Sequence, residues 1–455
     1  MAKKKILLMS DDLRMHSGVA TVSKDIVMET LNEYDWVQIA GAIKHPEKGK
    51  IVDMSEGLQE FGIKDGYLKI YPVDGYGNED ILREVLEMEK PDAILHYTDP
   101  RFWIWFYNME AELRRTMPIF YYNIWDDLPD PRYNTNYYRS CDLLMAISKQ
   151  TYGINKRLLK PYGYEDWQVT YVPHGISPRR FYQIEEDDIK LLNFDEQFGL
   201  SDKKYKILYS NRNIRRKMPG DVVLAYKYFM DELTPKQRKE CVLVFHCAPL
   251  DENGTDLPRV CKHLIPDYDV CFTYDRHNRP FDDNEMNLLF NTADVYVNMA
   301  SNEGFGLGSA EALTVGTPVI VNVTGGLQDQ CGFRNDDGEL LTPDDYIELG
   351  SNHRGKYKDH GEWVKTIYPA SISLQGSPPT PYIWDDRCNP EDAAISLREF
   401  YDLGREERKR LGGLGAEFCK ENQMTSQEMG KNFIKSMNGA FDNWKPKGRY
   451  TMETV

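Results

Sequence analysis

Short apolar runs alternate with stretches of helical spacing along the first part of the chain. In 79–89, the apolar residues Ile81, Leu82, Val85 and Leu86 recur as they would on one face of a helix, and 149–159 is also expected to be helical. Because short apolar runs suit strands buried on both faces, this alternation predicts a parallel sheet covered by helices. The expected strands cover 6–9, 36–40, 68–73, 93–97, 119–123 and 143–147.

The same alternation begins again in the second part of the chain. Here the expected strands cover 207–211, 241–247, 270–273, 295–299 and 319–321, and 283–293 has the spacing of a helix. Between the halves, 171–176 reads Y-V-P-H-G-I, so we interpret it as a crossing segment with His174 as a hinge or turn residue. The acidic stretch 185–195 is expected to be a linker or surface helix. A chain of 455 residues with this pattern predicts an α/β protein of two domains.

The most distinctive stretch, residues 301–312, reads S-N-E-G-F-G-L-G-S-A-E-A and lies between two expected strands. The pattern predicts a glycine-rich turn that leads into a short helix, with Glu303 on the turn and Glu311 inside the helix. Glycines let the backbone approach a ligand closely, and a helix start directs free N–H groups at it. Such a site suits a polyol that carries a diphosphate.

Two other segments are candidate phosphate sites. The cluster R-N-I-R-R-K at 212–217 directly follows an expected strand, and arginine and lysine can bind phosphate oxygens there. A run of charges is more often a solvated face, but its place after a strand favours phosphate. The turn S-G-V at 17–19 precedes a helix, so Gly18 is a second candidate, although a plain strand–helix turn explains it equally well.

Charge and cysteine usage restrict the classes of partner. The formal net charge is −16, so the chain is not a general polyanion binder, and any phosphate site must be local. The apolar run after Met1 is too short for a signal peptide, and no run approaches membrane-spanning length. The eight cysteines form no C-x-x-C pair, which favours buried thiols in a reducing compartment. We therefore expect a cytoplasmic protein without a membrane span.

Glu303 and Glu311 in E-G-F-G-L-x-x-x-E-A, followed by G-T-P-V-I, resemble the E-x7-E motif of retaining nucleotide-sugar glycosyltransferases of family four. The resemblance is strong over 207–329 and weak in the first half. It implies the GT-B fold, in which a cleft separates two Rossmann-like domains. On this basis 1–180 is the acceptor-side domain, 181–425 binds the nucleotide sugar, and 426–455 crosses back to the first domain.

The resemblance also implies roles for individual residues. In the family, an arginine and a lysine on the loop after the first strand of the second domain neutralise the donor diphosphate, and Arg212 and Lys217 match them. Glu303 would hold sugar hydroxyls and Glu311 the ribose hydroxyls. The extra Arg215 and Arg216 are solvated or face the acceptor. The implied catalytic residues are Glu303, Arg212 and Lys217, and the implied donor-binding residues are Gly18, Phe305, Gly306, Leu307 and Glu311.

One position departs from the family pattern. Members often have a histidine near the sugar at the end of the strand that corresponds to 119–123, and this chain has Trp125 there. If a backbone carbonyl carries the role, Trp125 can keep it. If an imidazole is needed, the role moves to Asp126, His96 or Asp99.

Residues 344–389 are longer than the family usually allows and hold several prolines with Tyr382, Trp384 and Arg387. We predict an insertion that folds over the cleft and helps to choose the acceptor, against the alternative of a surface excursion. The aromatic stretch 102–107 is more often core than a stacking platform. Asp267 and Asp269 form a D-x-D triplet that we interpret as a loop, so no metal site is expected.

Three functions remain open. The first is a retaining hexosyl- or pentosyltransferase that moves a sugar from a nucleotide diphosphate sugar, without another cofactor, to an unidentified hydroxyl. The acceptor would be a glycan, a small molecule or a modified DNA base, although the charge of −16 disfavours DNA. The second is another GT-B enzyme, such as an epimerase or phosphorylase. The third is a non-catalytic nucleotide-sugar-binding protein.

Overall fold

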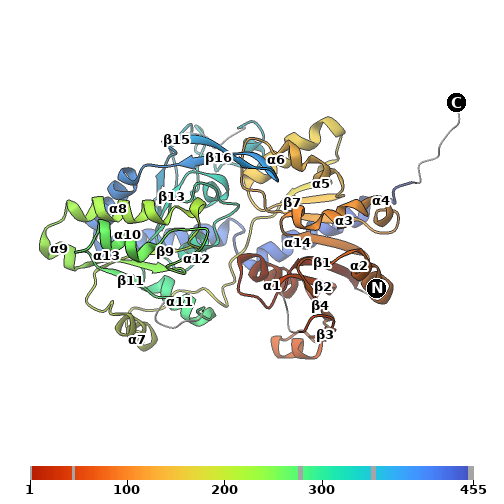
Figure 1. The fold of residues 1–455 in the computed structure, drawn as a ribbon, viewed down its shortest axis with the longest axis horizontal. Coiled ribbons are helices and arrows are strands. Elements are labelled where there is room, and N and C mark those ends of the chain that lie inside the picture. Colours follow the sequence, from red (N-terminus) through yellow and green to blue (C-terminus); the bar gives the residue numbers. More distant parts are fainter. Residues whose placement is uncertain (1–2, 44–46, 275–279, 350–354, 449–455) are drawn as a thin grey trace.

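The computed structural model describes residues 3–43, 47–274, 280–349 and 355–448, and it has two lobes side by side (Figure 1). Each lobe is built on its own sheet of mainly parallel strands. The first lobe contains the N-terminal strands, and the second lobe contains the later ones. The last helix returns to the first lobe (Figure 1).

The sheet of the first lobe has eight strands in the order β3-β4-β2-β1-β5-β6-β7-β8, and its neighbours are parallel except for the antiparallel pair β3 and β4. The strands are β1 (Lys4–Asp11), β2 (Tyr34–Ile43), β3 (Val52–Asp53), β4 (Leu68–Asp74), β5 (Ala93–Tyr97), β6 (Ile119–Asn123), β7 (Leu143–Ala146) and β8 (Val169–Tyr171). The helices are α1 (Gly18–Thr30), α2 (Glu79–Glu89), α3 (Ile104–Asn108), α4 (Glu110–Leu113), α5 (Thr135–Arg139) and α6 (Lys149–Leu159).

The sheet of the second lobe has six parallel strands in the order β11-β10-β9-β12-β13-β14. The strands are β9 (Tyr205–Ser210), β10 (Cys241–His246), β11 (Val270–Phe272), β12 (Val295–Asn298), β13 (Val319–Asn322) and β14 (Val364–Ile367). The helices are α7 (Ile189–Phe198), α8 (Pro219–Asp231), α9 (Pro235–Lys239), α10 (Leu257–Leu264), α11 (Asp283–Thr292), α12 (Leu307–Thr314) and α13 (Pro390–Glu421). The prediction of an α/β fold with parallel sheets is confirmed.

The prediction of one insertion over 344–389 is wrong in its middle part. Val364–Ile367 forms β14, which pairs in parallel with β13 and buries Val364 and Ile367. This strand was missed because it is short and has polar residues between its two apolar ends. The excursion that remains is an antiparallel hairpin of β15 (Ser371–Ser377) and β16 (Thr380–Arg387).

The chain crosses between the lobes at two adjacent places. Ile176 donates its N–H to Met424 O at 2.9 Å, and Ser426 donates its N–H to Ile176 O at 3.1 Å. Gly175 is required here because a Cβ would clash with the carbonyl of Thr425. Helix α14 (Ser426–Asn443) then packs on α1 in the first lobe, where Tyr34 donates its hydroxyl to Asn438 at 2.8 Å.

The aromatic stretch 102–107 divides between core and surface. Trp103, Phe106 and Tyr107 are buried, as expected of core residues, but Phe102 is 55% exposed. Within the described part of the chain, no helix combines the length and the apolar content that crossing a membrane requires.

Candidate functional site

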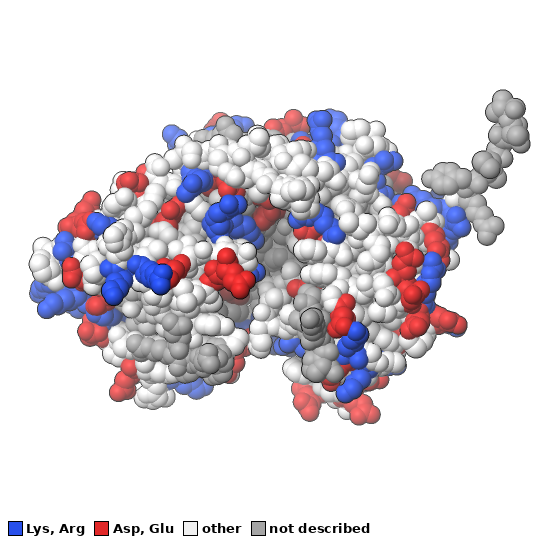
Figure 2. Space-filling model, in the orientation of Figure 1, with Lys and Arg blue, Asp and Glu red and all other residues white. Residues whose placement is uncertain are grey.

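A central cavity of about 1050 Å³ lies between the two lobes. It is lined by residues at the carboxyl ends of strands from both sheets, among them Asp11 after β1, Asp126 after β6, Lys217 after β9 and Glu303 after β12. Figure 2 shows the hollow between the lobes with basic side chains at its edge. Open parallel sheets bind ligands at this edge.

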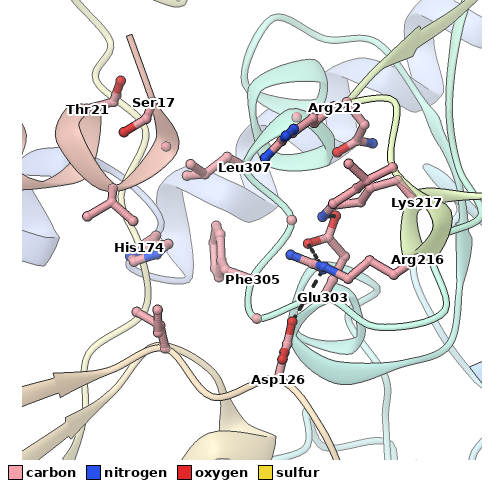
Figure 3. A pocket seen from close by; sticks show the side chains of 18 of the residues that line it. Ser17, Thr21, Asp126, His174, Arg212, Arg216, Lys217, Glu303, Phe305 and Leu307 are labelled. Carbon is pink, nitrogen blue, oxygen red and sulfur yellow. Dashed lines mark ion pairs between the residues drawn. The ribbon is translucent and has the colours of Figure 1, made fainter. Parts of the chain in front are cut away.

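Glu303 and Lys217 form a buried ion pair in the wall of the central cavity. Arg216 lies 3.8 Å from the second carboxylate oxygen of Glu303 (Figure 3). Asn298 donates its side-chain amide to Glu303 at 3.4 Å. Burial would raise the pKa of Glu303, but Lys217, Arg216 and Asn298 together hold it below the ordinary value. Burial also lowers the pKa of Lys217, against the pull of Glu303. The ion pair thus places an ionised carboxylate next to a cation in the buried wall of the central cavity.

Glycines shape the turn that carries Glu303. Gly306, with φ of 89°, precedes α12 and supplies no side-chain cap, so the first N–H groups of the helix are left for a ligand. Gly325, with φ of 49°, packs against the Glu303 backbone, where a Cβ would clash. Across the cavity, a Cβ on Gly18 would lie 3.2 Å from Leu307, so the starts of α1 and α12 come close together.

Glu311 lines the same cavity from α12, but its surroundings differ from those of Glu303. Among the described residues its carboxylate has no hydrogen-bond partner. Burial raises its pKa to about 7, opposed by Arg180 and reinforced by Asp25 and Asp283. Arg180 itself pairs with Asp25. A half-buried carboxyl without a partner among the described residues is available to hydroxyl groups of a ligand.

Arg212 lines the cavity, yet its side chain is 66% exposed and its Nε lies 3.1 Å from Asp251. To reach a diphosphate it would turn away from Asp251. Arg216 bridges the two lobes, since its guanidinium also lies 3.3 Å from Asp126 of the first lobe (Figure 3). Of the two basic residues left open by the sequence, both line the cavity, and Arg216 also contacts Glu303 and Asp126.

Trp125 is buried and lines the cavity, but its carbonyl is already engaged. Thr151 donates its hydroxyl to Trp125 O at 2.8 Å. The indole lies under the guanidinium of Arg101, 5.5 Å from the ring centre. Asp99 lines the cavity as well and pairs with Arg101. The carbonyl of Trp125 is thus a poorer candidate for the missing histidine's role than the sequence predicts.

His96 is outside the central cavity, which corrects its candidacy as a site residue. Its ring is buried and is hydrogen bonded to Tyr107 at 2.8 Å and Thr98 at 3.0 Å. Burial lowers its pKa to about 3, so it is a neutral core residue. The strand end 95–99 placed it near the site in sequence, but its side chain turns into the core.

His174 lines the cavity instead, although the sequence suggested only a hinge. Its ring lies 5.2 Å from that of Phe305, and its Nδ1 is 2.8 Å from the hydroxyl of Tyr122 (Figure 3). Burial lowers its pKa to about 3. The neutral imidazole packs against Phe305, which lies just before the start of α12.

At the far end of the cavity, aromatic and apolar residues form a flatter region. His246 lies 4.5 Å from the ring of Phe281, and burial lowers its pKa to about 4. Tyr274 and Met286 also line this end. Flat apolar surfaces of this kind suit a nucleobase.

The hairpin β15–β16 closes one side of the cavity and touches both lobes (Figure 1). Trp384 donates its N–H to Leu128 O of the first lobe at 2.6 Å, and its carbonyl accepts from Asn302 of the second lobe at 2.6 Å. Tyr133 donates its hydroxyl to Tyr382 O at 3.0 Å. The sequence analysis expected this segment over the cleft, and residues of both strands of the hairpin line the cavity.

Metal-binding geometry is absent from the described ranges. They hold no group of three His, Cys, Asp or Glu side chains that could bind a metal ion. The D-x-D triplet lies on a loop before β11, where Asp269 pairs with Lys203 at 2.6 Å.

Comparison with known proteins agrees with this architecture. A family profile described as "Glycosyl transferases group 1" matches residues 276–350. A mannosylfructose-phosphate synthase from Agrobacterium fabrum is 24% identical over 197 residues, which are 42% of this chain and 39% of the relative. An alpha-monoglucosyldiacylglycerol synthase from Acholeplasma laidlawii is 24% identical over 189 residues, 41% of this chain and 43% of the relative. The chain thus spans about two fifths of the length of these curated relatives.

Similarity in structure extends over the whole chain. Anabaena Alr3699/HepE, solved in complex with UDP and glucose, has a TM-score of 0.65 and 12% identity, covering 96% of this chain and 99% of that one. A likeness at this identity shows the fold. The prediction of two Rossmann-like domains in the GT-B arrangement is therefore confirmed.

Proposed function

We propose that this chain is a retaining glycosyltransferase that transfers a hexosyl or pentosyl group from a nucleotide diphosphate sugar to an acceptor hydroxyl. The observation that carries the proposal is the buried Glu303–Lys217 pair beside the uncapped start of α12, in a cavity between two Rossmann-like lobes. The profile match to glycosyl transferases over 276–350 and the UDP and glucose found with the structural neighbour support it.

The donor is placed along the cavity by its chemistry. Its base lies at the flat end near His246, and its ribose lies by Glu311 on α12. Its diphosphate meets Lys217 and the first N–H groups of α12, which are already in place, and Arg212 joins them once it turns away from Asp251. Its sugar then lies by Glu303, whose ionised carboxylate accepts hydrogen bonds from hydroxyls.

Transfer breaks the bond between the anomeric carbon and the diphosphate oxygen, and the diphosphate leaves with the electron pair. The acceptor oxygen forms the new bond on the same face, and its proton goes to the departing diphosphate. Lys217 and Arg212 stabilise the charge that develops on the leaving group. Because these cations serve the leaving group, the transfer is proposed not to require a metal, and no cofactor besides the donor is proposed.

The location and acceptor belong to the proposal as well. All eight cysteines are buried thiols outside any disulfide of the described structure, which supports a reducing compartment such as the cytoplasm. The hairpin β15–β16, which lines the cavity through Gln375, Thr380 and Ile383, is proposed to help select the acceptor. A glycan or small molecule is favoured over a modified DNA base, because the net charge is −16.

A panel of nucleotide sugars, incubated with and without hydroxyl acceptors and followed by NMR of the anomeric proton, tests the function. Transfer with the donor's anomeric configuration retained is the expected result, and inversion would contradict the retaining mechanism. An epimerised donor, or sugar 1-phosphate formed with added phosphate, would indicate the other GT-B enzymes. Binding of nucleotide sugar without any turnover would indicate a binding protein.

A further inference from the structure

A second cavity of about 850 Å³ adjoins the central one. The two cavities share six lining residues, so they meet where the loops after β6 and β9 come close to β16: Asp127, Arg212, Ile214, Arg215, Arg216 and Ile383. The second cavity is otherwise walled by the loop after β9, the start of α8, the turn 252–255 and the outer part of β16. A ligand there would reach the sugar end of the central cavity directly.

Asp127 lies where the two cavities meet, and one of its carboxyl oxygens makes no hydrogen bond with the described residues. Its side chain is buried, with 8% of the residue exposed, and its Oδ1 has no hydrogen-bond partner in the described structure. Burial, reinforced by the neighbouring Asp126, raises its pKa well above the ordinary value. An orphaned oxygen in a buried polar site indicates that a ligand completes it.

The remaining lining combines donors and acceptors. Arg387 lies 3.6 Å from Asp221, and the side chain of Arg215 makes no hydrogen bond or ion pair with the described residues. Asp385 and Asn253 add further polar groups. Guanidinium groups donate and carboxylates accept hydrogen bonds, a mixture that matches the vicinal hydroxyls of a sugar.

Other acceptor classes fit this cavity poorly. Among its described lining residues none is aromatic, so a nucleobase would find no stacking partner. The four arginines of the lining are matched by four carboxyl side chains, so the cavity lacks the excess of positive charge that a phosphodiester backbone attracts: Asp127, Asp221, Glu252 and Asp385. The apolar residues are too few and too scattered to form a lipid groove.

We propose that the second cavity is the acceptor site, that it binds a sugar, and that Asp127 Oδ1 accepts a hydrogen bond from the reacting hydroxyl. This inference rests on the proposed glycosyl transfer and names its acceptor class. From Asp127 the hydroxyl would lie beside Arg216, which contacts Glu303. It would approach from the side of the diphosphate cations, as attack on the retained face requires.

Gly220 offers a way to fill the second cavity without disturbing the fold. It lines the cavity in the first turn of α8, and a Cβ there would meet nothing within 4 Å. Gly439 in α14 is a matched control, because its Cβ position is equally open and it lines neither cavity. Gly220→Tyr and Gly439→Tyr are compared with the parent by melting temperature, by UDP affinity and by saturation-transfer NMR.

The NMR probes are D-glucose, D-mannose, D-fructose and maltose, each with and without UDP. We expect at least one sugar to bind both the parent and Gly439→Tyr. The Gly220→Tyr variant should bind that sugar about tenfold or more weakly, while its affinity for UDP is kept. Equal sugar binding by both variants, or no sugar bound to the UDP-saturated parent, would overturn the proposal. If none of UDP, GDP and ADP binds the parent, the proposed function fails, and sugar binding lost in Gly220→Tyr still supports a sugar site.

A second pair of variants tests the role of Asp127. Asp127→Asn keeps an oxygen at the junction and Asp127→Leu removes it. With UDP-glucose as donor and the bound sugar as acceptor, transfer should fall about tenfold or more in Asp127→Leu and be largely kept in Asp127→Asn. Equal loss in both variants, or transfer to 5-hydroxymethyl-2′-deoxycytidine in place of a sugar, would refute the assignment.

Discussion

At the scale of single residues, the site sets two glutamates of one motif in contrasting surroundings. Glu303 lies against Lys217 and Arg216 and has a lowered pKa. Glu311, in the helix that follows, has no such cation in contact, and burial raises its pKa to about 7. Groups whose environments push their pKa values apart have separate tasks. In the proposed reaction, the first holds the transferred sugar and the second the ribose.

Glu303→Gln should slow transfer by about a hundredfold or more, because the neutral amide loses the charge that faces Lys217 and the sugar. Its shape is nearly unchanged, so affinity for UDP should stay close to that of the parent. Steady-state kinetics and calorimetry measure the two effects. Glu339→Gln, on an exposed turn, is the control. Transfer at the parent rate in Glu303→Gln would exclude this carboxylate from catalysis.

Glu311→Gln should make the protein more stable and the donor site weaker. An acid whose folded pKa is about 7, above its ordinary 4.5, loses stability as the pH rises through that window, and the amide removes this loss. The variant should therefore melt higher than the parent at pH 8 but not at pH 4. Its affinity for UDP at pH 8 should fall by about 1.5–3 kcal/mol.

Thermal unfolding at the two pH values and calorimetry with UDP check this prediction. Glu339→Gln should show neither change, because its side chain is exposed. If the melting temperatures of the parent and of Glu311→Gln fall by the same amount between pH 4 and pH 8, Glu311 is not the group that titrates.

At this scale the sequence predicted part of the site. Glu303, Glu311, Lys217 and Gly18 could be found because strand ends and glycine turns give local signals, and the structure places all four in the central cavity. His174 and Asp127 could not, because their place in the wall depends on how the two lobes meet. The prediction that His96 is a site residue was wrong, because no local signal in the sequence tells which face of the sheet a histidine at a strand end occupies.

At the scale of elements, the hairpin β15–β16 ties the two lobes together over the cavity. Its second strand hydrogen bonds to Leu128 in the first lobe and to Asn302 in the second. The alternative of a surface excursion is not favoured by these contacts. The strands β5 and β6 and the helices α2 and α6 were predicted at their observed bounds, because they are continuous apolar runs or strongly amphipathic. The two strands of the hairpin were not predicted, because their residues are half exposed or exposed and the two strands form a sheet only with each other.

Replacing 372–386 by an Asn-Gly turn should leave a folded protein that binds UDP but transfers at least about tenfold more slowly. Ser371 and Arg387 face each other across the hairpin, so a two-residue turn can join them. Loss of the hairpin opens the acceptor side of the cavity. Leu374→Ser, on its exposed face, is the control.

Transfer at the parent rate in the shortened protein would show that the hairpin has no part in acceptor binding. A deletion of all of 344–389 would instead unfold the second lobe, because it removes β14 from the sheet. Circular dichroism and melting curves distinguish a local loss from this global one.

At the scale of the whole molecule, the two lobes are held together by more than the crossing segments. Asp329 of the second lobe accepts hydrogen bonds from the Lys149 N–H and the Tyr171 hydroxyl of the first, each at 2.9 Å. Arg216 and the hairpin add contacts on the cavity side. The cavity walls therefore come from both lobes.

Activity should survive chelation. In an excess of EDTA we expect the rate of transfer to stay within about twofold of the untreated rate, because Lys217 and Arg212 stabilise the leaving diphosphate. Initial rates before and after dialysis against EDTA provide the measurement. Complete loss that Mn²⁺ or Mg²⁺ restores would contradict a metal-independent transfer.

The central claim is that the cavity between the lobes binds the diphosphate of a nucleotide sugar through the cations after β9. Calorimetric titration of the parent, Lys217→Met and Lys204→Met with UDP, GDP and ADP tests it most directly. Lys204 is the control because it carries the same charge on the surface, paired with Glu240. The account predicts that at least one nucleoside diphosphate binds the parent and Lys204→Met equally, and that Lys217→Met weakens this binding about tenfold or more. Equal binding by Lys217→Met, or no binding of any of the three to the parent, would contradict it.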